Sequence, residues 1–317
     1  MILNKKQNKS AEKSGLLKPA KTPPIKIQGI KTKLVPFILN NIKWDGRGRW
    51  VEPFVGSGVV LFNAAPIQAI AADTNKHIIR VYQALQNNEV TPNNLRTFLE
   101  TEGQALREKG EAHYYEVRSR FNESQSPFDF IFLNRSCFNG VIRFNSRGKF
   151  NVPFCRKPER FSQAYITKIC NQAAWVADTM RGKKWEFIAQ DWRQTISLIR
   201  PDDFVYLDPP YNDRHTDYFN QWSLEDADAL AQAVKSLKTG FAYSTWKQNQ
   251  YRVNEHLAKH FIGYPTVTTQ HFYHVGSTEE LRNPIEEALV ISANNVADEP
   301  HLTTRQNTVR KPATPFL

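Results

Sequence analysis

The sequence predicts an α/β fold in which a mostly parallel sheet is covered by helices on both faces. Three observations support this prediction: short apolar strands alternate with helical stretches, a glycine-rich turn joins the first strand to a helix, and acidic residues follow several strands. Sheets of this kind bind ligands in crevices at the carboxyl ends of their strands, so the functional site is expected at that edge.

Six strands are expected, each a short run rich in β-branched, aromatic or other apolar residues. The first, residues 49–54, leads into a turn at 55–58, after which a helix begins at Val59. The others are expected at residues 67–72, 184–190, 203–207, 240–244 and 285–292. Asp73, Asp191 and Asp208 directly follow three of these strands, which places them where such sheets bind ligands.

Residues 86–180 break this alternation and are expected to form an inserted recognition module. Residues 92–121 have the pattern of amphipathic helices. Residues 135–160 are rich in Arg, Asn, Gly and Phe, with turns predicted at 139–140 and 147–148, and basic residues outnumber acidic ones there. Residues 25–85 and 181–295 would then form one catalytic domain around this insertion.

The two ends of the chain, residues 1–24 and 296–317, are polar and contain little to bury. We predict a disordered basic arm at the amino terminus, which either touches nucleic acid or is simply solvated, and a flexible tail at the other end. The net charge of +11 favours a polyanionic partner. No apolar run approaches the roughly 20 residues that span a bilayer, and no signal peptide is recognisable, so we expect a cytoplasmic protein without membrane contact.

No metal is expected from the motifs in this sequence. The three cysteines, Cys137, Cys155 and Cys170, form no CxxC pair, which argues against a zinc site and against a disulfide framework. His271 and His274 are expected to be packing or surface residues rather than ligands.

The tetrapeptide Asp208-Pro209-Pro210-Tyr211 follows the strand at residues 203–207 and is the strongest indication of function. Prolines fix the backbone and have no N–H, so their carbonyls are left as outward-facing acceptors. The carboxylate is a second acceptor, and the tyrosine ring offers a face for stacking. Two acceptors and a ring suit the exocyclic amino group of a flat heterocycle, which indicates methyl transfer to the amino group of a nucleobase.

A second indication is the segment Glu52-Pro53-Phe54-Val55-Gly56-Ser57-Gly58, between a strand and a helix. Glycines let the backbone pass close under a ligand, and the acid at the end of the next strand, Asp73, could accept hydrogen bonds from ribose hydroxyls. The third glycine of a dinucleotide-binding loop is absent, as is a phosphate-loop lysine. A nucleoside-containing cofactor without phosphates fits better, and S-adenosyl-L-methionine is the natural candidate.

These motifs, taken in order, resemble the Dam-type DNA adenine-N6 methyltransferases (D12 class, alpha group) over residues 25–292. Residues 27–36 look like the family's first cofactor motif, residues 138–143 and 149–154 like its recognition hairpin, and Gln190-Asp191-Trp192 like the site for the cofactor's adenine. The resemblance implies a Rossmann-like S-adenosylmethionine-dependent sheet with an inserted helical and β-hairpin target recognition domain. It departs at Ile27, where relatives have Trp, at Gly29-Ile30-Lys31, where they have Gly-Gly-Lys, and at Cys155, where they often have Gly.

The resemblance also implies roles for individual residues. The target adenine would be flipped out of the duplex, Asp208 and the Pro209 carbonyl would accept its amino hydrogens, and Tyr211 would stack on it. The residues expected to bind the cofactor are Ile27, Lys31, Glu52, Pro53, Phe54, Gly56, Ser57, Gly58, Asp73, Asp191, Trp192 and Asp208. Those expected to bind double-stranded DNA are Lys26, Asn139, Val141, Arg143, Asn151, Pro153 and Arg156.

Several alternatives remain open at this point. Asp191 could be a helix N-cap, Trp192 a core residue or a replacement for the missing aromatic at position 27, and Lys31 a surface charge. Arg143 is the best candidate for reading guanine. Phosphate contacts are expected instead for Arg135, Arg147, Lys149 and Arg160, unless these form only a solvated basic face.

The expected function is a site-specific adenine methyltransferase, in a restriction-modification system or alone, acting as a monomer without a stable complex with a cognate restriction endonuclease. The hairpin favours GATC as the target, although residues 213–222 are similar to relatives with other targets. Cytosine-N4 methylation is a rival that usually has Ser in place of Asp208. A non-catalytic DNA-binding scaffold and a restriction nuclease are rivals of other classes, and the sequence offers no convincing metal-binding acid cluster for the nuclease.

Overall fold

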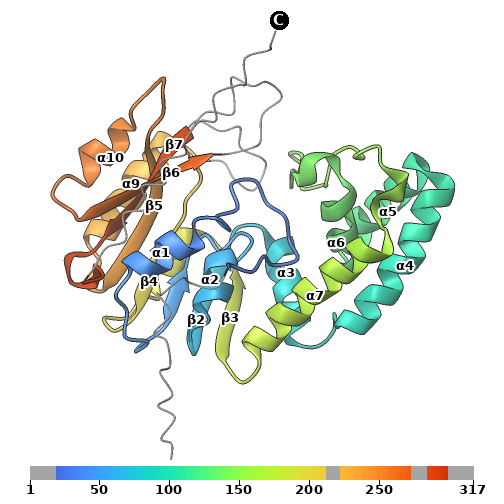
Figure 1. Cartoon of the computed structure of the whole chain (residues 1–317), viewed down its shortest axis with the longest axis horizontal. Helices are drawn as coiled ribbons and strands as arrows, with labels where there is room; N and C mark the ends of the chain where they lie inside the picture. Colours follow the sequence, from blue (N-terminus) through green and yellow to red (C-terminus); the bar gives the residue numbers. More distant parts are fainter. Residues whose placement is uncertain (1–18, 212–221, 273–283, 299–317) are drawn as a thin grey trace, which may run out of the picture.

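The computed structural model describes residues 19–211, 222–272 and 284–298, and at its centre is a sheet of seven strands (Figure 1). The strands are β1 (Trp50–Glu52), β2 (Gln68–Asp73), β3 (Lys184–Ala189), β4 (Phe204–Leu207), β5 (Gly240–Gln248), β6 (Thr266–Phe272) and β7 (Pro284–Ile291). Their order across the sheet is β3-β2-β1-β4-β5-β7-β6. Strands β1 to β5 pair in parallel, whereas β7 is antiparallel to both β5 and β6. The mostly parallel α/β sheet predicted from the sequence is confirmed.

Strand β6 was not predicted from the sequence, although all the others were. Among the described strands it lies at the edge of the sheet and pairs with β7 alone. Of its residues only Val267 is buried, and the rest are mainly polar. An edge strand with so few buried side chains lacks the apolar pattern by which strands are recognised.

The helices are α1 (Val35–Asn41), α2 (Val59–Ala64), α3 (Lys76–Gln86), α4 (Pro92–Lys109), α5 (Glu111–Ser124), α6 (Pro127–Ser136), α7 (Gln163–Met180), α8 (Trp192–Ser197), α9 (Leu224–Lys235) and α10 (Glu255–His260). Short 3₁₀ turns are η1 (Phe138–Gly140), η2 (Pro158–Arg160) and η4 (Ala293–Asn295). Within the described residues no helix is both long enough and apolar enough to cross a membrane.

Alternate side chains of the central strands enter two different cores, because successive residues of a strand point to opposite faces. Trp50 and Phe204 belong to the larger core, which includes residues of α1, α2 and α3. Their neighbours Val51 and Val205 belong to the second core, with residues of α8 and α9 and with Phe261, just past α10. Helices therefore cover both faces of the sheet, as predicted.

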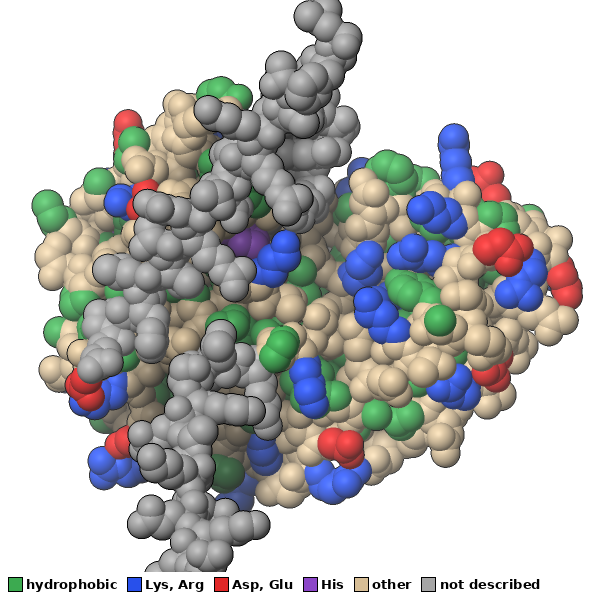
Figure 2. All heavy atoms as spheres, viewed as in Figure 1, with side chains coloured by type: hydrophobic (Ala, Val, Ile, Leu, Met, Phe, Trp, Pro, Cys, Tyr) green, Lys and Arg blue, Asp and Glu red, His purple; other side chains and the backbone are tan. Residues whose placement is uncertain are grey.

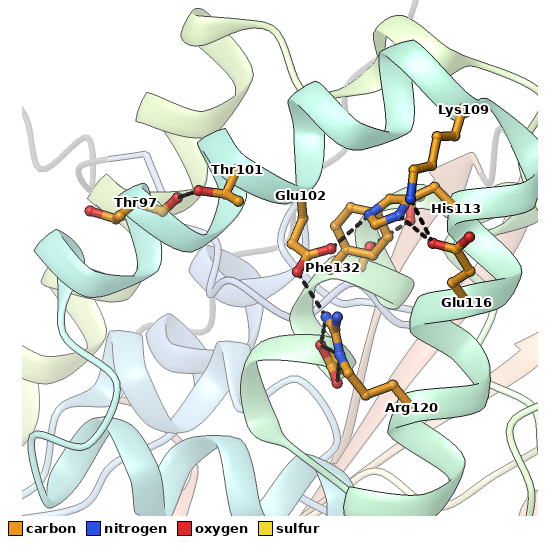
Figure 3. A network of polar contacts seen from close by, with 10 residues as sticks. Thr97, Thr101, Glu102, Lys109, His113, Glu116, Arg120 and Phe132 are labelled. Carbon is orange, nitrogen blue, oxygen red and sulfur yellow. Dashed lines mark hydrogen bonds and ion pairs between the residues drawn. The ribbon is translucent and has the colours of Figure 1, made fainter.

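Helices α4 to α7 form a lobe beside the sheet, on the side of β3 (Figure 1). Polar contacts join three of its helices (Figure 3). The guanidinium of Arg120 donates to the buried carboxylate of Asp129 at 2.6 Å and to Glu102 at 2.9 Å. His113 Nε2 lies 2.7 Å from the other oxygen of Glu102. Because these residues come from α4, α5 and α6, the network fixes the three helices relative to one another.

Residues 137–161 connect α6 to α7 without forming a regular hairpin. Two isolated antiparallel bridges are present, one between Cys137 and Phe154 and one between Phe144 and Phe150. The turns predicted at 139–140 and 147–148 are both present, with positive φ at Asn139 and at the glycine of each turn. Backbone hydrogen bonds cross between its two arms, among them those from the Phe138 amide to the Pro153 carbonyl and from the Asn145 amide to the Lys149 carbonyl, both 2.9 Å. All four bridge residues are buried in the larger core.

Both described chain ends pack on the body of the molecule. Pro23 and Pro24, which fall within the predicted basic arm, are buried. Val296, at the start of the predicted tail, pairs with Ile42, and the following amide donates to the Asn41 carbonyl at 3.1 Å. Residues 1–18 and 299–317 lie outside the described residues, as does most of the segment 213–222 on which the target prediction partly depends.

Candidate active site

A cavity of about 710 Å³ opens at the carboxyl ends of β1, β2 and β4. It brings together most of the predicted site residues. Those that line it are Ile27, Lys31, Glu52, Pro53, Phe54, Gly56, Ser57, Asp73, Asn139, Val141, Arg143, Pro153, Asp191, Trp192, Asp208, Pro209, Pro210 and Tyr211. The predicted residues that do not line it are Lys26, Gly58, Asn151 and Arg156.

The glycine loop lies between β1 and α2, and its two glycines have positive φ, +48° at Gly56 and +65° at Gly58. A side chain at Gly58 would also collide with the ring of Phe62, because a Cβ there would lie 2.6 Å from it. Gly58 therefore shapes the start of α2 rather than the cavity. Gly56 does face the cavity, where a Cβ would come within 3.5 Å of Ile27 Cδ1.

Asp73 holds this loop in place. One carboxylate oxygen accepts from the Gly56 amide at 2.9 Å, and the other accepts from the Asn75 amide at 2.8 Å. Asp73 also lines the cavity. The sequence predicted a ligand-facing acid here, and bracing the loop is a further role that it did not reveal.

Asp191 is a helix N-cap and Trp192 a core residue, and both also line the cavity where a cofactor contact was predicted. Asp191 caps α8 by accepting from the Arg193 amide at 2.8 Å, and it also lines the cavity. Trp192 is part of the second core, and one side of it lines the same cavity. Its ring lies edge-on to Trp222 at 6.5 Å, and the Arg193 guanidinium lies over it at 4.4 Å. The indole is thus fixed from several sides.

A buried lysine lies next to the tetrapeptide that follows β4. Lys31 is only 3% exposed, and its Nζ is 2.5 Å from the Tyr211 hydroxyl and 3.5 Å from Asp208 Oδ1. The alternative that Lys31 is a surface charge is wrong. The ammonium group also lies 4.8 Å from the centre of the Tyr211 ring. The first cofactor motif and the tetrapeptide, far apart in the sequence, are joined by this one side chain.

Glu287, on β7, is a functional candidate that sequence reasoning missed. It is 2% exposed, and its Oε2 accepts from Tyr211 at 2.8 Å and from Lys31 Nζ at 3.2 Å. The signal for it in the sequence is a pair of acids, Glu286 and Glu287, between Ile285 and the apolar run Ala288-Leu289-Val290-Ile291. Charged residues are rarely buried unless paired, so such an interruption is worth noting.

Glu52 adds a further carboxyl group to the wall of the cavity. It is buried, and the Trp50 indole N–H donates to its Oε1 at 2.8 Å. Burial raises the pKa of Glu52 to about 8, and the nearby charge of Asp208 acts in the same direction. This buried carboxyl therefore holds its proton at neutral pH.

The residues predicted to meet DNA differ in how far they are exposed. Arg143 is exposed at the cavity rim, and its Nε donates to Asn151 Oδ1 at 3.0 Å, so Asn151 orients the guanidinium from outside the cavity. Lys26 is half-buried against Gly140, and its backbone makes two hydrogen bonds of 2.8 Å with the Asn134 side chain. Arg156 is exposed and has a positive φ of 58°.

The expectation that Arg135 contacts phosphates is wrong. Its side chain is buried, with Nε donating to the Pro24 carbonyl at 2.7 Å and another nitrogen donating to Gln172 at 2.6 Å. Arg160 is half-buried, donates to the Arg135 carbonyl and lies 4.6 Å from the centre of the Tyr165 ring. Arg135 joins α6 to the Pro24 carbonyl and to α7, and Arg160 joins the segment 137–161 to the end of α6 and to Tyr165. A basic run in a sequence cannot distinguish such internal contacts from a free basic surface.

Comparison with known proteins agrees with this geometry. Residues 28–281 match the family model of the D12 class N6 adenine-specific DNA methyltransferases. The chain is 31% identical to a DNA adenine methylase of Serratia marcescens over 198 residues, which is 59% of this chain and 68% of that protein. It is 30% identical to the type II methyltransferase M.MjaIII of Methanocaldococcus jannaschii over 207 residues, 60% of this chain and 68% of the other.

A longer match is to the type II methyltransferase M1.LlaDCHI of Lactococcus lactis subsp. cremoris. It is 26% identical over 289 residues, which is 86% of this chain and 96% of that protein. The family model spans both the first cofactor motif and the tetrapeptide. The two are in contact through the hydrogen bond from Lys31 to Tyr211. The chain therefore belongs to the D12 class N6 adenine-specific DNA methyltransferases, as its motifs predicted.

Proposed function

We propose that this protein transfers a methyl group from S-adenosyl-L-methionine to N6 of an adenine in a short duplex DNA target, with GATC as the first sequence to test. One observation carries the proposal. A single cavity joins the glycine loop, the tetrapeptide and the segment containing Asn139, Arg143 and Pro153. A cofactor, a flipped base and the DNA next to that base could therefore be held side by side.

The lining of the cavity fits this cofactor. Carboxylates that suit a cationic ligand come from Asp73, Asp191 and Asp208, and Glu52 adds a protonated carboxyl group to the wall. Gly56 leaves the loop without a side chain where the backbone faces the cavity, and Trp192 offers an aromatic edge. When bound, S-adenosyl-L-methionine supplies an electrophilic methyl group on a positively charged sulfur. We assign its binding to these residues together with Ile27, Lys31, Pro53, Phe54, Ser57 and Gly58, the last acting through the shape of the loop.

The tetrapeptide would hold the adenine amino group. Asp208 and the Pro209 carbonyl accept its two hydrogens, Pro210 keeps the turn rigid, and the Tyr211 ring stacks on the base. An amino nitrogen conjugated with the ring is a poor nucleophile. Two acceptors favour a localised lone pair and stabilise the positive charge that develops on the nitrogen during transfer. Lys31 and Glu287 fix Tyr211 and Asp208 in position through the contacts described above.

Base reading is assigned to Arg143. Its Nε is occupied by Asn151, which leaves the two terminal nitrogens of the guanidinium to face a guanine edge. Asn139, Val141 and Pro153 lie beside it on the cavity wall, and Lys26 lies behind Gly140. Figure 2 shows Lys and Arg side chains on the part of the helical lobe that borders the sheet, where they could meet phosphates. Arg156 is exposed for such a contact.

We further propose that the protein works in the cytoplasm as a monomer, since one strand can be modified per encounter. A cognate restriction endonuclease, if there is one, would act separately and not in a stable complex. The relatives named type II methyltransferases support a place in restriction-modification, and those named DNA adenine methylase support a solitary enzyme.

The test is transfer of labelled methyl groups to unmethylated DNA by the wild type, Asp208→Ala and Asp202→Ala. Asp202 is exposed and lies just before β4, at the opposite end of this strand from Asp208, and it is the matched control. We expect label on adenine N6, retained in Asp202→Ala and reduced at least about 100-fold in Asp208→Ala. Mapping the modified bases then tests GATC. Binding of cofactor and DNA without any transfer would contradict the proposal, whereas adenine labelled in another sequence would contradict only the target.

A further inference from the structure

Three potential metal ligands lie close together outside the active-site cavity. They are on the side of the molecule away from the helical lobe. They are Asp228 on α9 and His256 and His260 on α10. One ligand atom of each lies within 4.8 Å of the other two. Helices α9 and α10 lie side by side at the left of Figure 1. The two histidines are four residues apart, so both point from the same face of α10 toward α9.

The histidine nitrogens point at one oxygen of the aspartate. His260 Nε2 lies 2.7 Å from Asp228 Oδ1, and His256 Nε2 lies 3.4 Å from the same atom. The two imidazole rings are 4.5 Å apart. His256 Nε2 is fully buried, and within the described part of the chain it has no hydrogen-bond partner. A buried polar atom without a partner needs an explanation, and an ion is one of the usual ones.

The two distances from the histidine nitrogens to Asp228 Oδ1 are close to those of a tetrahedral metal site. Bonds of about 2.0–2.1 Å to imidazole nitrogen and carboxylate oxygen place neighbouring ligand atoms about 3.3 Å apart. The pair formed by His256 and Asp228 already has this spacing, and the His260 pair would have to open by about 0.6 Å. The aspartate side chain is 41% exposed, so it has room to move by this amount.

We propose that Asp228, His256 and His260 form a binding site for a divalent transition-metal ion, with Zn²⁺ the best match. Two imidazoles and one carboxylate suit zinc, cobalt or nickel, whereas magnesium and calcium prefer oxygen ligands alone. The metal would connect α9 to α10. His256 also borders a small cavity of about 40 Å³ whose walls include Pro209, Pro210 and Tyr211, so the ion would lie behind the tetrapeptide and stiffen its surroundings.

Lys259 competes with the metal in the structure as it stands. Its Nζ lies 2.7 Å from Asp228 Oδ2, the oxygen that does not face the histidines. The ammonium group neutralises part of the charge that a metal would need. Removing the Lys259 charge should therefore strengthen metal binding. A cluster that is only hydrogen-bonded would gain no affinity for metal from that change.

The site is not visible as a sequence motif. Two histidines at this spacing are common on helices, and the third ligand comes from another helix, before β5. The expectation that no metal binds was based on the absence of a compact motif, and only the packing of α10 against α9 brings these side chains together.

The experiment uses the full-length protein without an affinity tag, stripped with a chelator and titrated with Zn²⁺ and with Co²⁺. Competition with a chromophoric chelator gives the Zn²⁺ affinity, and the visible absorption of Co²⁺ reports four-coordinate nitrogen and oxygen ligation. We expect one ion per chain and a higher Tm with zinc. His256→Ala and His260→Ala should each weaken binding at least about tenfold, and Lys259→Met should strengthen it several-fold.

Two controls keep this test decisive. His113→Ala removes a histidine from the Glu102–Glu116 cluster of the helical lobe and should leave the zinc affinity unchanged. Asp228→Asn keeps the side-chain shape and should still weaken binding, which covers the case in which an alanine variant fails to fold. Absence of binding in both the wild type and Lys259→Met would overturn the proposal, as would unchanged binding in the His256→Ala/His260→Ala double variant.

Discussion

At the scale of single residues, the buried charges beside the tetrapeptide stand out because they come from the two ends of the described chain. Lys31 belongs to the first motif and Glu287 to the last strand, yet their charged groups are 3.2 Å apart. Burying an ion costs several kcal/mol, and a pair in the interior adds little net stability compared with apolar residues. Such a pair is better explained by what it positions, which here is Tyr211 and Asp208.

Glu287→Gln should therefore impair catalysis more than binding. The amide can still accept from Tyr211, but it no longer balances the charge of Lys31, so the tetrapeptide shifts relative to the base. Small displacements of aligned groups cost up to about 100-fold in rate, and we expect kcat to fall between about tenfold and that limit, with the DNA KM nearly unchanged. Glu286→Gln, on the same strand and paired with Lys247, is the control. An equal loss in both variants would show that Glu287 has no special role.

Glu52 should make the stability of the protein depend on pH. In the folded protein its pKa is about 8, against an ordinary value near 4.5, so the folded state keeps a proton that the unfolded state releases. Stability from this group is complete below about pH 4.5 and is lost as the pH rises toward 8. Glu52→Gln removes this dependence and still accepts from Trp50. Its free energy of unfolding should exceed that of the wild type by an amount that grows from pH 5 to 8, to on the order of 3 kcal/mol.

Urea unfolding of both proteins at several pH values measures this difference, and Glu186→Gln provides the control. Glu186 is exposed on β3, so its replacement should leave a small difference that does not vary with pH. A difference between Glu52→Gln and the wild type that stays flat from pH 5 to 8 would mean that Glu52 is ionised in the folded protein.

At the scale of elements, the turn between β1 and α2 depends on a glycine for two separate reasons. Gly58 has a φ of +65°, and a Cβ there would lie 2.6 Å from the Phe62 ring. Gly182 has a φ of +72°, and a Cβ there would meet no atom of the described residues within 4 Å, so this position isolates the backbone effect. Gly182→Ala should destabilise by roughly 1 kcal/mol, and Gly58→Ala by roughly 1–3 kcal/mol more because Phe62 must move. Equal losses in thermal unfolding would show that the ring gives way freely.

Elements with strong local patterns were predictable from the sequence, and those held by distant contacts were not. The strand before Gly56 and the strand before Asp208 are apolar and end at recognisable turns, so they appear in the structure within a few residues of the predicted bounds. Strand β6 was not predicted because its hydrogen bonds come from its partner β7, while its side chains remain mostly exposed. The segment 137–161 has the antiparallel pairing expected of a hairpin, but as isolated bridges rather than a regular ladder, and buried Phe side chains anchor it to the core.

The same distinction applies to the site. Residues that carry a motif, such as Asp208 and Asp73, were found from the sequence because their neighbours along the chain identify them. Glu287 was missed and Arg135 was misassigned, since their partners, Lys31 and the Pro24 carbonyl, lie more than 100 residues away. Whether a charged side chain faces solvent or the interior is decided by these long-range contacts, which one sequence does not reveal.

At the scale of the whole molecule, the net charge of +11 predicts DNA affinity that falls steeply with salt, because bound phosphates release counterions. The basic residues do not contribute alike. Arg135 is buried, and Arg160 is held against Tyr165. Exposed side chains on the segment 137–161 remain, among them Arg143 at the cavity rim and Arg156 farther along.

These two arginines should have separable effects on DNA binding. Arg143→Gln removes a group placed to read a base, so it should weaken binding to the cognate duplex by about 1–3 kcal/mol and leave non-cognate binding nearly unchanged. Arg156→Gln removes a proposed phosphate contact, so it should weaken binding to all duplexes alike and reduce the slope of log K against log salt by about 1. Arg181 is exposed at the end of α7 and paired with Asp178, so Arg181→Gln should change neither sequence preference nor the salt slope.

Titrations of the four proteins with cognate and scrambled duplexes at several salt concentrations measure both effects. If Arg143→Gln changed the salt slope without changing sequence preference, Arg143 would be a phosphate contact, and the base reader would have to be sought among the other side chains of the cavity rim.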